Sequence, residues 1–148
     1  MYRGNFAMRD QEVRAAFHKR VLKSAHKDPE VFVVDELGLK NGEVRADIAV
    51  INGRLVGYEI KTDKDNLNRL SSQIIAYNEV FDKVFIISGE KHLEKVKALV
   101  PEWWGIYAII PTAPNRCSFR CVRRGKLNRE KNSFGVAQLL WKEEAREI

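Results

Sequence analysis

The sequence predicts one α/β domain over residues 1–148, in which helices flank a mixed central sheet. The order of periodic segments predicts it: a helix, three strands, a helix and a strand, followed by further elements. The composition agrees, because 148 residues with 45% hydrophobic and 31% charged side chains are enough to bury a core. We expect the first three strands to form a meander and the fourth to return beside them.

Each element of the first half has a local signature. A helix is expected over 8–27, because Val13, Phe17 and Val21 recur at four-residue spacing and the Asp-Pro step at 28–29 ends it. β-Branched residues predict strands over 31–37, 44–51 and 54–61, separated by Asn-Gly turns at 41–42 and 52–53.

The second half alternates in the same way. A helix is expected over 65–81, with a core stripe of Leu67, Leu70, Ile74, Tyr77 and Phe81. Further elements are expected at 83–88 (strand), 90–100 (helix), 105–111 (strand), about 117–122 (strand) and from 133 (closing helix). Trp103 and Trp104, after Pro101, are interpreted as packing residues rather than base-stacking ones.

The composition excludes several classes of protein. Because the chain has neither an apolar run long enough to span a bilayer nor an apolar signal region, we expect a cytoplasmic protein without membrane contact. Cys117 and Cys121 suit a reducing compartment, and with three scattered histidines they are a poor zinc pattern, so we expect buried or half-buried thiols.

The net charge of +6 is concentrated in one segment. Residues 116–131 contain seven basic side chains and one acid, whereas the rest of the chain has 19 of each sign. Such a patch is typical of proteins that bind polyanions, nucleic acid first; a solvated loop is the alternative. The basic residues are Arg116, Arg120, Arg123, Arg124, Lys126, Arg129 and Lys131.

An acid and a base lie two residues apart in an apolar strand. Glu59 and Lys61 share a face of the strand at 54–61, and Asp47 lies on the preceding strand. A two-residue hairpin loop would turn Asp47 to the opposite face, so we predict an odd connection at 51–53 with Gly53 in the left-handed conformation. Gly57 is then expected on the acids' face, leaving room for an ion or a phosphate.

Two carboxylates and a lysine held together suit a particular chemistry. Neighbouring acids repel and must share a proton or a cation. Hard oxygen ligands in small number suit Mg²⁺ or Mn²⁺, and a lysine beside the metal can polarise water for phosphodiester hydrolysis. A Lys–Glu pair on a solvated sheet face is the alternative.

Asp47 followed by Glu59-Ile60-Lys61 resembles the bipartite motif of the PD-(D/E)XK nuclease superfamily. The expected order of elements resembles its restriction-endonuclease-like core (αβββαβ), and Gln73 to Tyr77 resembles the Q-x-x-x-Y motif of the RecB-like branch. The likeness covers about residues 8–110, leaving 111–148 as a basic extension, and the chain looks similar to a little-characterised family of small bacterial proteins. Ala46 stands where the superfamily name has proline.

The resemblance implies a role for each matching residue. Asp47, Glu59 and the Ile60 carbonyl would bind the metal, and Lys61 would position the attacking water. Glu12 matches the helix acid that reaches the same metal or a second one; it has no basic residue three or four positions on.

Other polar residues are expected around this site. Asp65, Arg69, Gln73 and Tyr77 lie at four-residue steps, so Arg69 is expected to hold a phosphate while Gln73 and Tyr77 orient the site. Tyr77 is also compatible with a half-core position. Glu36 and Arg45, which the resemblance marks, are expected to support the metal ligands; a salt bridge between Arg45 and Glu36 or Asp47 is the alternative.

Together these patterns predict a divalent-metal-dependent nuclease that acts on DNA through sequence-independent backbone contacts, with a homodimer or a partner protein supplying specificity. The alternative is a nucleic-acid-binding or docking subunit that keeps the fold without cutting. A different hydrolase is not supported, because the chain has neither H-E-x-x-H nor a phosphate-binding glycine loop.

Overall fold

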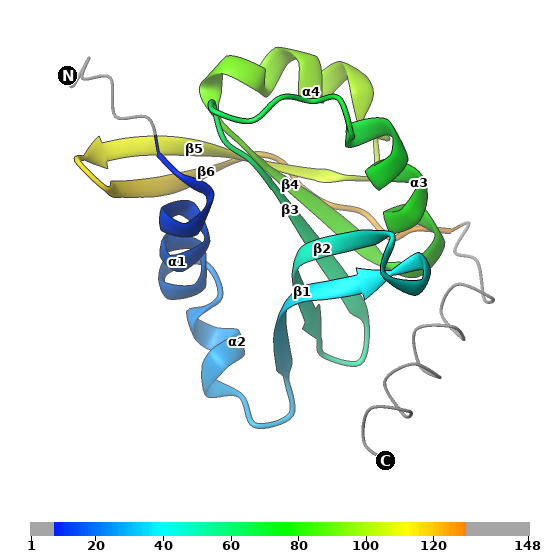
Figure 1. Cartoon of the computed structure of the whole chain (residues 1–148). Coiled ribbons are helices and arrows are strands. Elements are labelled where there is room, and N and C mark those ends of the chain that lie inside the picture. The colour runs from blue at the N-terminus through cyan, green and yellow to red at the C-terminus, as the bar shows by residue number, and fades with distance from the viewer. Residues whose placement is uncertain (1–7, 130–148) are drawn as a thin grey trace.

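The computed structural model describes residues 8–129, which form a six-stranded mixed sheet flanked by helices (Figure 1). The strands lie side by side in chain order. Their bounds are β1 Phe32–Leu39, β2 Val44–Ile51, β3 Leu55–Lys61, β4 Lys83–Ser88, β5 Gly105–Ala113 and β6 Arg116–Arg123.

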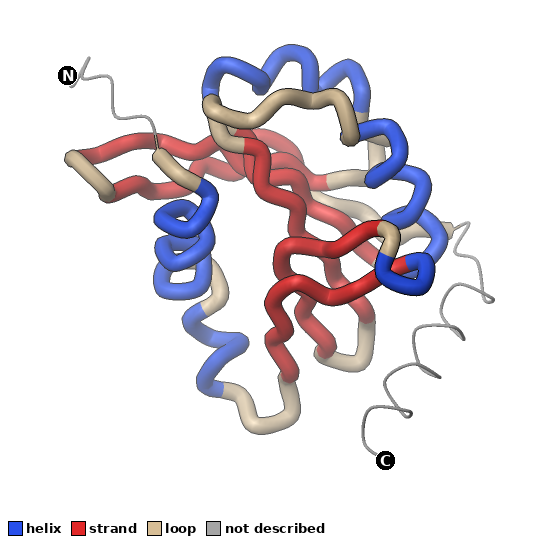
Figure 2. The backbone as a smooth tube through the Cα atoms, viewed as in Figure 1, coloured by secondary structure: helices blue, strands red, loops and turns tan. Residues whose placement is uncertain are grey.

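The sheet is antiparallel at both edges and parallel in the middle. β1, β2 and β3 form the predicted antiparallel meander, and β4 returns parallel to β3, as expected. β5 continues parallel to β4, and β6 closes the sheet as an antiparallel hairpin with β5 (Figure 2). The carboxyl ends of β3, β4 and β5 therefore lie along one side of the sheet.

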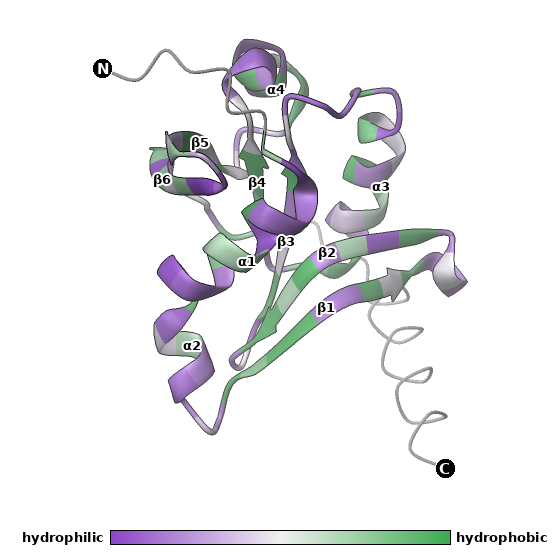
Figure 3. Cartoon of the chain, turned by 60° about the vertical axis from the view of Figure 1, so that its left-hand side comes forward, coloured by the Kyte–Doolittle hydropathy of each residue, from purple (hydrophilic) through white to green (hydrophobic). Residues whose placement is uncertain are grey.

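Helices cover both faces of the sheet and enclose two cores. Val13 and Phe17 of α1 (Asp10–Arg20) pack with strand residues such as Tyr58, and α2 (Lys23–Lys27) follows on the same side. On the other face, α3 (Leu70–Val80) and α4 (Leu93–Leu99) cover a core around Tyr77 and Trp104. Hydrophobic residues run along the strands, whereas α1 and α2 carry many hydrophilic ones (Figure 3). Two short 3-10 turns, η1 (Lys40–Gly42) and η2 (Glu90–His92), complete the described elements.

The helices begin and end differently from the predictions. The expected helix 8–27 is broken after Arg20, where the Phe17 carbonyl accepts from the amides of both Val21 and Leu22 and Leu22 turns into the core. The expected helix 65–81 begins only at Leu70, because the Asp65 side chain caps the turn after β3. The closing helix expected from 133 lies outside the described residues.

The β2–β3 hairpin has the predicted odd connection. Ile51 pairs with Leu55, so the loop is 52–54 rather than 51–53, and Gly53 has the predicted positive φ of 90°. The register therefore differs by two residues, which keeps the predicted parity and brings Asp47 directly opposite Glu59.

The space expected at Gly57 is filled by a side chain. A Cβ atom built on Gly57 would lie 2.7 Å from Cδ2 of the buried Phe81 ring. The prediction of room for an ion or a phosphate is wrong, because the Phe81 ring, which follows the end of α3, packs against Gly57.

This close approach makes a stability prediction. We expect Gly57→Ala to lower the free energy of unfolding by about 1–3 kcal/mol, since the added methyl group overpacks the core. Urea unfolding measures it, and the double variant with Phe81→Leu should lose less than the sum of the two single changes. An unchanged midpoint for Gly57→Ala would contradict the observed packing.

Several smaller expectations are settled by burial. Trp104 is fully buried and its Nε1–H donates to Asn78 Oδ1 at 2.9 Å, which confirms its packing role. Both cysteines are free thiols; Cys117 is buried as expected, whereas Cys121 is exposed, so the expectation is wrong for Cys121. Within residues 8–129, no helix combines the length and the apolar character needed to cross a membrane.

Candidate functional site

The candidate site lies where β2 separates from β3. Paired residues of these strands end at Ile48 and Tyr58. Beyond that point the two strands diverge, and we call this place the fork. There the Asp47 side chain, rather than the β2 backbone, pairs with β3: its Oδ2 accepts the Ile60 amide at 2.7 Å. β1 bends at the same level, because Glu36, opposite Asp47, has a φ of 55° and the ladder skips this pair. The Asp47 side chain lies in this gap and is 19% exposed.

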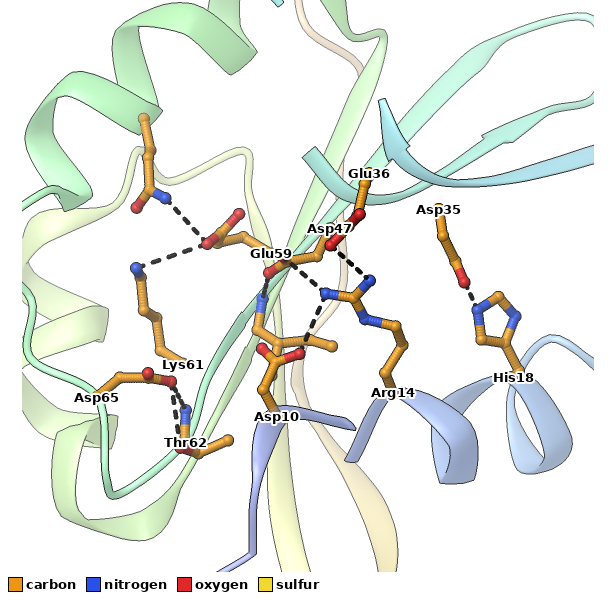
Figure 4. A network of polar contacts seen from close by, with 12 residues as sticks. Asp10, Arg14, His18, Asp35, Glu36, Asp47, Glu59, Lys61, Thr62 and Asp65 are labelled. Atoms are coloured by element: carbon orange, nitrogen blue, oxygen red, sulfur yellow. Dashed lines mark hydrogen bonds and ion pairs between the residues drawn. The ribbon is translucent and has the colours of Figure 1, made fainter. Parts of the chain in front are cut away.

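Glu59 lies at the centre of a buried polar cluster beside Asp47. It is 3% exposed, and two α3 side chains donate to it: Gln73 Nε2 to Oε1 at 3.1 Å, and the Tyr77 hydroxyl to Oε2. Lys61 Nζ lies 3.5 Å from Glu59 Oε1 and is itself mostly buried (Figure 4). The four predicted residues Glu59, Lys61, Gln73 and Tyr77 are therefore brought together.

Burial raises the pKa of both acids in the cluster. Burial, reinforced by the charge of Asp47, raises the pKa of Glu59 to about 8, although Lys61 and the Tyr77 hydroxyl act in the opposite direction. Burial also raises the pKa of Asp47, against the lowering effects of the Ile60 amide and Arg14. Two buried carboxylates of this kind remain ionised together only if a cation joins them.

Arg14 of α1 supplies a positive charge on the outer side of the fork. Its Nη2 lies 3.1 Å from Asp10 Oδ1 and 3.3 Å from Asp47 Oδ1, and its Nη1 lies 3.6 Å from Glu36 Oε1. One guanidinium thus bridges carboxylates from α1, β1 and β2 (Figure 4).

The donors present fit a small, hard cation. Gln73 Oε1 is buried and has no hydrogen-bond partner among the described residues, and it lies on the amide that contacts Glu59. Mg²⁺ needs only one or two carboxylates, with waters in its other positions. Asp47 and Glu59 meet that need, although no group of three or more His, Cys, Asp or Glu side chains within residues 8–129 is arranged for a metal.

Glu12 does not join this cluster, contrary to expectation. It lies beside β6, in a hollow lined by Lys19, Arg116 and Cys117, and its buried Oε2 has no partner in the described part of the chain. The α1 residues that reach the site are instead Asp10 and Arg14, because the helix turns this edge toward the strand fork.

Two other supporting residues also differ from expectation. Arg45 is exposed on β2, and the ion pairs of Glu36 and Asp47 go to Arg14. Asp65 lies before α3, where its Oδ2 accepts the Thr62 amide at 2.7 Å, so it leaves the predicted helical stripe. Arg69, at the N-cap of α3, is exposed.

The basic segment is only partly free for a ligand. Arg123 donates to the carbonyls of Trp104 and Pro101, each at 2.9 Å, so it holds the chain rather than a phosphate. Lys131 lies outside the described residues. The remaining members are exposed: Arg116, Arg120, Arg124, Lys126 and Arg129.

A pattern in the sequence could have predicted the α1 residues near the site. Asp10, Arg14 and His18 recur at four-residue steps and form a polar stripe next to the apolar one. In the structure His18 Nε2 lies 2.7 Å from Asp35 Oδ1, and His18 Nδ1 lies 2.8 Å from His26 Nε2. The stripe faces β1 and lines a hollow with Asp35 and Glu36.

Comparison with known proteins places the chain in a family. A family model described as bacteriophage P4 protein cII matches residues 5–148. The chain belongs to this protein cII family. Protein cII of enterobacteria phage P4 is 29% identical over 143 residues, which are 95% of this chain and 53% of that protein. The chain therefore spans about half the length of this relative.

A solved structure supports the fold. A Silicibacter pomeroyi protein of unknown function superposes with a TM-score of 0.58 at 14% identity, covering 99% of this chain and 90% of that one. At this identity the likeness concerns the fold alone.

Proposed function

We propose that this cII-family chain is a divalent-metal-dependent nuclease that hydrolyses phosphodiester bonds in DNA. One observation carries the proposal: Asp47 lies directly opposite Glu59, and Lys61 Nζ lies 3.5 Å from the Glu59 carboxylate. A pair of carboxylates with an adjacent lysine is the constellation that metal-assisted hydrolysis requires.

The fold supports the same proposal. A helical segment, three antiparallel strands, a helix and a parallel strand follow one another from α1 to β4. This order is compatible with the restriction-endonuclease-like core that the sequence resembles, and Gln73 and Tyr77 lie on the helix after the lysine strand.

Each residue has a task in this scheme. Asp47, Glu59 and the Ile60 carbonyl would hold Mg²⁺ or Mn²⁺, which supplies Lewis-acid stabilisation of the phosphate when bound. Tyr77 and Gln73 fix the Glu59 carboxylate through their hydrogen bonds. Lys61 orients the attacking water and stabilises the charge that develops on the phosphate.

Exposed cations supply the contact with DNA. Arg116 and Arg120 lie on β6, three strands from β3, which is roughly 14 Å at ordinary strand spacing. That distance allows phosphate contacts along a duplex but not at the scissile bond, so these residues contribute affinity rather than catalysis. A second copy or a partner protein in the cytoplasm would supply specificity.

The proposal predicts metal-dependent cleavage that requires Asp47. Plasmid and single-stranded DNA should be cut by the wild type with Mg²⁺ or Mn²⁺ and not with EDTA, and Asp47→Ala should abolish cutting because a metal ligand is lost. The matched control is Glu43→Gln, which removes an exposed acid just before β2 and should cut normally. Equal cutting by wild type and Asp47→Ala would reveal a contaminant.

The alternative is a non-cleaving subunit that binds nucleic acid. The contact that favours it is Arg14, whose guanidinium neutralises Asp47 without any metal. DNA binding that survives EDTA, with no cleavage of any DNA form, would support this function instead.

A further inference from the structure

The two oxygens of the Asp47 carboxylate have different partners. Oδ2 accepts the Ile60 amide at 2.7 Å, and that bond takes the place of strand pairing at the fork. Oδ1 faces Arg14 Nη2 at 3.3 Å. A cation that binds Asp47 through Oδ1 is therefore repelled by the guanidinium charge of Arg14.

Arg14 cannot release this oxygen by losing a proton, because a guanidinium stays charged at any pH that a protein tolerates. It also cannot share the oxygen easily with a divalent ion, since both carry positive charge and would lie within a few ångströms of each other. The Arg14 charge at its present position therefore opposes metal binding at Asp47.

The surroundings of Arg14 allow its side chain to move away from Asp47. Its side chain is 18% exposed and lines a surface hollow between α1 and β1 rather than a closed core. Asp10 and Glu36, which it already contacts, lie toward that hollow, and the Glu36 side chain is 57% exposed. Arg14 would keep two of its three carboxylate partners after leaving Asp47.

We propose that Arg14 is a displaceable internal cation that competes with the divalent metal for Asp47, so that α1 gates metal binding. This inference rests on the proposed metal-dependent function. In the apo protein Arg14 stabilises the charge of Asp47; in the metal-bound protein it turns to Asp10 and Glu36.

The test is Mn²⁺ affinity, measured by the electron paramagnetic resonance signal of free Mn²⁺ or by calorimetry without any substrate. We expect Arg14→Gln to bind Mn²⁺ about tenfold more tightly than the wild type, since a nearby charge shifts such equilibria by about one logarithmic unit or more. Arg14→Lys, which keeps the charge but has a single ammonium group, should lie between the two.

The control is Arg20→Gln, which removes the same charge from the exposed end of the same helix and should leave the affinity unchanged. Because Arg14→Gln leaves three acids without their shared partner, thermal unfolding of each variant checks that it is folded. Arg14→Lys provides the comparison if Arg14→Gln is not.

The outcomes separate the two proposals. If all four proteins bind Mn²⁺ equally and Asp47→Ala does not, the metal site stands and the role of Arg14 is overturned. Weaker binding by folded Arg14→Gln would also overturn it, since Arg14 would then support the site. If no variant binds Mn²⁺, the metal-dependent function fails together with this inference.

Discussion

Replacing Lys61 with alanine should lower the rate of DNA cleavage about a hundredfold to a thousandfold, the usual effect of removing one group that stabilises transition-state charge. Lys61 Nζ lies 3.5 Å from Glu59 Oε1, and the side chain is only 10% exposed, so its charge acts at short range in a weakly solvated place. In the proposed mechanism the lysine is not a metal ligand. Mn²⁺ binding should therefore survive the substitution.

This separation of binding from cleavage makes the experiment specific. Lys61 lowers the pKa of Glu59, so its loss favours protonated Glu59 and weakens metal binding below that pKa. Affinity and cleavage should consequently be compared above the pKa of Glu59, where the carboxylate is ionised in both proteins. Single-turnover rates and Mn²⁺ titrations on the same samples provide the two readouts.

Lys64→Ala is the matched control, because Lys64 is an exposed lysine three residues further along the chain. It should cut at the wild-type rate. If Lys61→Ala cuts DNA as fast as Lys64→Ala does, Lys61 has no part in the chemistry and only balances the charge of Glu59.

The alternation of strand residues was enough to predict the centre of the site. Glu59 and Lys61 share a face by their spacing, and the Asn52-Gly53 step indicated a hairpin whose loop had to be odd for Asp47 to join them. The loop proved to be one residue further along, since Ile51 and Leu55 pair. The alternation of side chains therefore predicts correctly which strand residues share a face. It does not predict which residues form the last pair before the turn, because that depends on packing around the turn.

The residues that sequence patterns missed are those placed by tertiary contacts. Arg14 reaches Asp47 because β2 leaves β3 at Ile48 and α1 packs against the opening. No local periodicity encodes such a fork, so Glu12, an acid on the same helix, was an equally reasonable choice. Likewise, Arg123 looks like its basic neighbours in the sequence, yet the turn over 101–104 presents two carbonyls to it.

Glu59→Gln should make the protein more stable at the alkaline end of its range, by on the order of a few kcal/mol. The folded pKa of Glu59 is about 8, whereas the ordinary value is 4.5. Between these values the folded state holds a proton that the unfolded state has lost. The stabilisation is fully present below the ordinary value and disappears as pH rises through about 8.

Glutamine has the shape of the protonated acid and cannot ionise, so its unfolding free energy should vary less with pH over this range. The hydrogen bonds permit the exchange: Tyr77 can still donate to a side-chain oxygen, and the unpartnered Gln73 Oε1 can accept from the new amide after rotation. Urea unfolding across the window measures the slope, with Glu43→Gln as the exposed control. Parallel pH curves for wild type and Glu59→Gln would show that Glu59 titrates normally.

The same pair of proteins links stability to the metal. A cation that binds ionised Glu59 must displace its proton, so Mn²⁺ should raise the unfolding temperature of the wild type more above the pKa of Glu59 than below it. Glu59→Gln, already stabilised, should gain little from Mn²⁺ at either pH because a carboxylate ligand is gone. An equal gain in both proteins would place the cation elsewhere on the chain, whereas a gain confined to the wild type would make the buried acid a metal ligand that the apo fold keeps protonated.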